Sequence, residues 1–261
     1  MGHLRLGRLP KTRRWVDVVE LLDASPEDAA GIAAGVVVAA DQRLKELGSD
    51  PSLGYCFWLL TRIAWASREP DFQQTLSKLG IEASSDTSVL AFISQLADHV
   101  QIETARNTSS GHFAELSSLA LRRALSETAG QYTGNLFGAT VDGLQQAFRA
   151  YSRPDEFGRL SHRFFADFFA RTLSSLVDRE LSHHVGRGKS FESSTNSAAF
   201  IKALDLHSRE SARIMETFAA DWYSKHNWEA KGEISVVEAQ GFVAVALRKL
   251  RSEFKMGAVG K

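Results

Sequence analysis

The sequence has few residues that could crosslink the chain or hold a metal. It contains one cysteine in 261 residues, so no disulfide and no cysteine metal site can form within one chain. This residue, Cys56, stands in the apolar run Tyr55 to Leu60, where we expect a buried, unreactive thiol. The composition fits a reducing, cytoplasmic setting.

The sequence also lacks net charge, because 31 basic residues offset 31 acidic ones. This balance disfavours a dedicated nucleic-acid binder, which usually carries a global positive field. The charge is unevenly placed: residues 1–14 hold five basic residues and no acid, whereas residues 15–50 hold eight acids and two basic residues. The basic arm 1–14 can therefore fold back on the acidic segment or reach an anionic partner.

Long hydrophobic runs are missing as well. The apolar run from Ala29 to Ala40 has 12 residues, whereas a helix needs about 20 to span a bilayer. The pair Arg13-Arg14 superficially resembles a twin-arginine export signal, but acidic residues follow where such a signal requires an apolar region. We therefore expect a soluble protein without a membrane segment.

Strand patterns are absent, and helix signals take their place. No alternating segment is bounded by hairpin turns, which argues against a sheet. Ser25-Pro26 is typical of the start of a helix, here one reaching about Leu47, and Asp50-Pro51 is typical of the next start. Ser235 and Glu238 form a capping box before the last helix. The sequence predicts an all-α fold, an orthogonal or irregular multi-helix bundle of about eight to ten helices with no sheet.

The two longest helical segments are expected at 154–184 and 194–226. Phenylalanines cover more than one face of the first, which predicts burial on both sides. Arg163, Asp167 and Arg171 are expected to form an exposed ladder on the remaining surface. The predicted organisation is the basic arm 1–14, an N-terminal helical layer at 15–106, a C-terminal bundle at 107–256 that can share one core with that layer, and a tail at 257–261.

Two polar patterns near residue 185 resemble ligand sites only in part. Gly186-Arg187-Gly188-Lys189-Ser190 ends like a phosphate-binding loop, but His183 stands where the first glycine is required. A glycine-terminated helix with two exposed cations explains it better, although its backbone amides can hold an anion. Glu180 and His183 form one half of a di-iron pattern whose second half is missing. We therefore expect no metal and no cofactor.

Other cations and histidines have structural and functional interpretations. His99 and His207 lie on apolar helical stripes, where a hydrogen-bonded core histidine is the expected role and a ligand or pocket residue is the alternative. Residues that could contact an anion or nucleic acid are Arg13, Arg14, Arg187, Lys189, Arg248, Lys249 and Arg251.

The segment from Arg106 through Asn107 to His112 falls in a break between two expected helices. It resembles the R-x(4–6)-H signature of HEPN ribonucleases, an all-α family in which a polar residue commonly follows the arginine, as Asn107 does here. The resemblance implies metal-independent RNA cleavage, with His112 in acid–base work and Arg106 on the scissile phosphate, usually across a dimer. A second match to this signature runs from Arg179 to His184.

The sequence as a whole favours binding over catalysis. Five tryptophans, 16 phenylalanines and many arginines provide the side-chain types that dominate interface energetics. We expect a non-catalytic helical interaction subunit or adaptor of a larger cytoplasmic assembly. The subunit would bind protein partners or a second copy of itself, and in one version of the hypothesis the assembly acts on nucleic acid. The alternative is a HEPN-like ribonuclease of the toxin or defence type that uses Arg106 and His112.

Overall fold

The computed structural model describes residues 13–82, 87–107, 113–133, 141–181, 185–186, 191, 193–229 and 233–256. Within these ranges the chain is all-α, as predicted, with one isolated bridge between Val185 and Phe191 and no strand. The helices are α1 (Arg13–Ala24), α2 (Ala29–Ala39), α3 (Asp41–Glu46), the 3-10 turn η1 (Leu47–Ser49), α4 (Pro51–Ala66), α5 (Phe72–Ser77), α6 (Val89–Asn107), α7 (Ala114–Thr133), α8 (Val141–Ala150), α9 (Pro154–Leu181), α10 (Ser194–Ser211), α11 (Ile214–Glu229) and α12 (Val236–Met256).

Two of the predicted cap sites are confirmed, and one is displaced. The Asp50 carboxylate accepts from the backbone of Ser52 at 2.9 Å and begins α4, while Ser235 and Glu238 form their reciprocal box before α12. Ser25 does not cap the second helix. Asp28 does so by accepting from Gly31 N at 3.0 Å, which brings the carboxylate so close that a Cβ on Gly31 would lie 2.2 Å from it.

The helix count over the described residues rises to twelve because two predicted helices are each divided. The break after α10 has a clear cause on α9. Nε2 of His162 lies 2.8 Å from the carbonyl oxygen of Arg209. In a continuous helix this carbonyl would accept a hydrogen bond from the amide of Arg213. That amide instead donates to Glu210 O at 3.1 Å, a tighter turn of the 3-10 type. The turn lets α10 and α11 both pack against α9.

Helix α9 is the centre of the packing, as its phenylalanines predicted. Phe157, Phe164 and Phe168 are fully buried, and α9 packs against α7, α10 and α11. Gly158 permits the closest approach, because a Cβ there would lie 2.1 Å from the backbone oxygen of Glu216 on α11. Apolar burial in one cluster that reaches from α1 to α12 supplies the main stabilising free energy of the fold.

The exposed ladder predicted on α9 is wrong. Asp167 is only 2% exposed and accepts from Arg171 on its own helix and from Arg123 on α7, the latter at 3.0 Å. Arg163 donates instead to the Tyr151 hydroxyl at 3.3 Å. Asp167 therefore joins two helices rather than decorating one.

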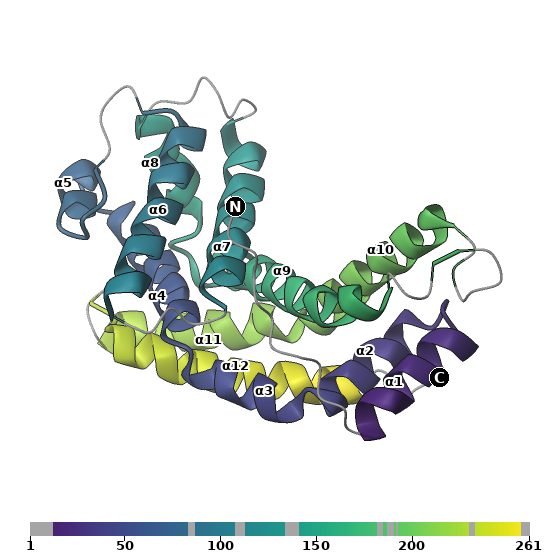
Figure 1. The fold of residues 1–261 in the computed structure, drawn as a ribbon. Helices are drawn as coiled ribbons and strands as arrows, with labels where there is room; N and C mark the ends of the chain where they lie inside the picture. Colours follow the sequence, from purple (N-terminus) through teal and green to yellow (C-terminus); the bar gives the residue numbers. More distant parts are fainter. Residues whose placement is uncertain are drawn as a thin grey trace.

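Figure 1 shows the arrangement of these layers. Helices α6, α7 and α8 stand together at one end, α1 and α2 lie at the other, and α12 runs along the base between them. Helix α4 packs mainly on α12, and α11 packs mainly on α9. Among the described helices, none combines the length and apolar character needed to cross a membrane.

Candidate functional site

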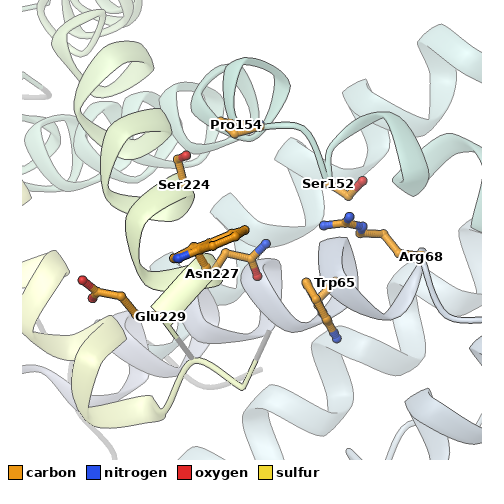
Figure 2. A pocket seen from close by; sticks show the side chains of 8 residues that line it. Trp65, Arg68, Ser152, Pro154, Ser224, Asn227 and Glu229 are labelled. Atoms are coloured by element: carbon orange, nitrogen blue, oxygen red, sulfur yellow. The ribbon is translucent and has the colours of Figure 1, made fainter. Parts of the chain in front are cut away.

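An open pocket of about 920 Å³ lies where the ends of α4 and α11 meet the turn between α8 and α9 (Figure 2). This volume is within the range of sites that bind small molecules or side chains of a partner. The lining side chains come from three distant segments and are Trp65, Arg68, Ser152, Pro154, Ser224, Asn227, Trp228 and Glu229. We call this site the tryptophan pocket.

Packing between α4 and the start of α12 holds the wall of the tryptophan pocket. The indole nitrogen of Trp58 donates to the carbonyl of Ile234 at 2.8 Å, two helical turns before Trp65 on the same face of α4. Ile234 is buried, so this bond ties the segment that precedes α12 to α4. The helix that carries Trp65 is therefore held by a contact between residues that are far apart in the sequence.

One of the two tryptophans of the pocket is unusually open to solvent. Trp228 is 87% exposed, the most exposed large apolar side chain among the residues described. The guanidinium of Arg68 lies 5.0 Å from the ring centroid of Trp65, a cation–π contact that orients the arginine at the pocket. Tryptophan and arginine are among the residue types most enriched in interface hot spots, and this pocket contains both.

Two buried polar atoms on α11 near this pocket make no hydrogen bond within the described residues. Oδ1 of Asn227 and the hydroxyl of Tyr223 are buried, and neither makes a hydrogen bond to any residue that the structure describes. The two residues are four positions apart, so they lie on one face of the helix. Burial raises the pKa of Tyr223, which keeps its hydroxyl protonated. An unsatisfied buried acceptor costs about 1–3 kcal/mol, so Asn227 would gain from a ligand that donates to it.

The pocket also contains one charge of each sign. Arg68 and Glu229 both line it, and Figure 2 shows them on opposite sides, with Asn227 and Trp65 between them. Neither side chain forms an ion pair with any residue in the described ranges. Within the described part of the chain, neither charge is therefore neutralised by an oppositely charged side chain.

The cations predicted on α12 do not form a common anion-binding face. Arg251 donates to the carboxylate of Asp41, with its side chain only 13% exposed. Lys249 lies over the ring of Phe218, 4.9 Å from the centroid. Arg248 alone is exposed on this helix among the three.

The remaining predicted cations are scattered. Arg13 and Arg14 are exposed in the first turn of α1. Arg187 and Lys189 lie outside the described residues, so their anion-binding role stays a prediction.

The ribonuclease-like pair is described only in part. Arg106 is an exposed residue that pairs with Glu103 at 2.8 Å, while the Asn107 side chain and His112 lie outside the described residues. The structure therefore assigns Arg106 a local partner on α6 and does not place it relative to His112.

His99 and His207, the two histidines predicted on apolar stripes, make specific contacts. His99 is hydrogen-bonded as predicted, with Nε2 at 2.9 Å from the hydroxyl of Tyr55. Burial lowers the pKa of His99, which favours the neutral ring. His207 meets the ring of Phe254 edge-on at 5.4 Å. Cys56 is fully buried, as expected, and burial raises the pKa of its thiol.

Metal-ligating side chains do not gather in groups of three or more within the described residues. The side chains of Glu180 and His183 lie outside them.

The tryptophan pocket was not predicted from the sequence. The available signal was Asn227-Trp228-Glu229 at the end of an expected helix. Successive residues of a helix point in different directions, so a tryptophan and its two polar neighbours cannot all face the core. Comparisons with protein-family models, curated proteins and solved structures found no match to this chain.

Proposed function

We propose that this chain is a non-catalytic interaction subunit of a larger cytoplasmic assembly, and that it binds a protein partner at the tryptophan pocket. The observation that carries the proposal is Trp228, which exposes 87% of its surface at the rim of an open pocket. Burying such a side chain against a partner removes a large apolar area from water. Trp65 and Arg68 supply the adjoining contacts.

The chemistry of the lining supports binding rather than catalysis. Its two serines have no histidine among the lining residues to act as a base, and the Ser152 hydroxyl donates to the carbonyl of Arg149 at 2.7 Å. Support for nucleic acid is weaker than for protein, because Arg251 is already paired with Asp41 and the pocket itself has balanced charge.

Affinity purification from the native source with matched variants tests the proposal. Trp228→Ala should reduce recovery of a specific partner about 30-fold or more, as for an interface hot spot. Val237→Ala is the control, because Val237 is 80% exposed and does not line the pocket. Quantitative mass spectrometry of the two variants and the wild type gives the readout. Equal recovery of every partner by wild type and Trp228→Ala would place binding elsewhere or nowhere.

A further inference from the structure

We propose that the tryptophan pocket recognises an extended segment of the partner that carries an acidic side chain for Arg68, an apolar side chain for the tryptophans and a basic side chain for Glu229. This inference rests on the proposed function, because it names the chemistry of the partner at the same site. It follows from the charge, the hydrogen-bonding capacity and the apolar surface of the pocket.

The charges favour a peptide over a nucleic acid. Arg68 attracts an anion, but Glu229 lies on the other side of the pocket and repels one. A nucleic-acid strand carries a phosphate on every nucleotide, so it would bring negative charge to Glu229 as well. A peptide segment can present an acid to Arg68 and a base to Glu229, which matches both charges.

Asn227 provides the contact to the peptide backbone. A carboxamide has one acceptor oxygen and two donor hydrogens, so it can accept from an N–H and donate to a C=O of an extended chain. Its Oδ1 is buried and has no hydrogen bond to the residues described. Figure 2 places Asn227 between the two charged residues, where the middle of such a segment would pass.

The apolar part of the lining sets the central side chain. Trp65, Pro154 and Trp228 offer rings and methylene groups but few polar atoms. A leucine, methionine or aromatic side chain of the segment would bury area against them. An open pocket rather than a closed cavity suits a side chain that remains attached to its own backbone.

The test uses the full chain and a library of capped nine-residue peptides, each with one glutamate, one lysine and one central apolar residue, in every order. Binding is measured by fluorescence anisotropy against wild type and Trp228→Ala. We expect a best peptide whose affinity falls about 30-fold with Trp228→Ala. The absence of any Trp228-dependent peptide would overturn the inference.

Double-mutant cycles then assign the charges. Arg68→Gln should weaken the best peptide about fivefold but leave its Glu→Gln version unchanged, as expected for one partly exposed ion pair. Glu229→Gln should act in the same way on the lysine of the peptide. Additive losses in both cycles would overturn the assignment.

Single-stranded DNA and RNA oligonucleotides form the opposing arm. Trp228-dependent oligonucleotide binding that Glu229→Gln strengthens and Arg68→Gln weakens would overturn the peptide in favour of nucleic acid. The two proposals fail separately. If the purified partner needs Trp228 but tolerates both charge variants, only this inference fails; if it tolerates Trp228→Ala as well, the proposed function fails too.

Discussion

Helices α4 and α11 each place one aromatic residue in the core and another in the tryptophan pocket. Phe57 on α4 stacks on Phe242 at a centroid distance of 4.5 Å, and Tyr223 on α11 stacks on Phe157 at 4.0 Å. Two turns after Phe57, Trp65 is only half-buried, and Trp228 is almost fully exposed. The same residue class thus stabilises the fold at one place and is available for binding at the other.

Charged residues show the same contrast. Asp167 is buried and satisfied by two arginines, whereas Arg68 and Glu229 make no ion pair within the described residues. Paired buried charges cost free energy to separate, while exposed unpaired charges contribute little to folding. Substitutions in the two regions should therefore separate stability from binding.

Phe57→Ala should have the largest effect on stability. The ring is fully buried among aromatic neighbours, so its removal should lower the free energy of unfolding by about 3–5 kcal/mol. Urea denaturation measures this change. Trp228→Ala is the matched comparison and should stay within about 0.5 kcal/mol of wild type; similar losses for both would remove the distinction between core and pocket.

Asp167→Asn should have the next largest effect. The substitution removes the charge that Arg123 and Arg171 share, and both arginines reach partly into solvent, with side chains 41% and 33% exposed. We expect a loss of about 2 kcal/mol, below the full cost of breaking a buried pair. Asp205→Asn is the control, because its pair with Arg209 is more open and should be worth about 1 kcal/mol or less. Thermal unfolding of both variants measures the two losses of stability. Equal losses would show that burial of Asp167 does not strengthen its ion pairs.

Asp41→Asn should have a smaller, pH-dependent effect. Hydrogen bonds from Lys45, Arg251 and Lys255 hold the pKa of Asp41 well below its ordinary value. A carboxyl group whose pKa is depressed in the folded state stabilises the protein fully at pH values above its unfolded-state pKa of about 3.9. This stabilisation is lost progressively as the pH falls below that value. We therefore expect Asp41→Asn to cost about 1 kcal/mol at pH 7, with the difference from wild type narrowing below about pH 4. Urea titrations at pH 7 and pH 3 measure this; a constant difference would contradict the assignment.

Arg106 and His112 should show the smallest effects. Arg106 is in an exposed pair, so Arg106→Ala should change stability by about 0.5 kcal/mol or less. If the chain is non-catalytic, wild type and His112→Ala should leave mixed RNA equally intact without added metal. Cleavage by wild type that both variants abolish would instead support the ribonuclease hypothesis.

Local sequence signals predicted most helix starts, since a cap depends on a few neighbouring residues. They failed where two good caps competed, because Ser25 and Asp28 are both favourable cap residues and the helix begins at Asp28. They also missed the turn after α10, because the contact that stabilises it comes from His162 on another helix. None of the pocket residues was predicted as a site, since exposure of Trp228 cannot be read from periodicity alone.

The sequence by itself determined the all-α class, the caps at Asp50 and Ser235, and the burial of Cys56 and the phenylalanines of α9. These depend on helix propensity and apolar spacing over a few turns. Only the tertiary structure decided that Asp167 meets Arg123, 44 residues away, that Arg251 meets Asp41, 210 residues away, and that three segments meet at the tryptophan pocket. Such meetings depend on how helices pack against one another, which the periodicity of a single helix does not specify.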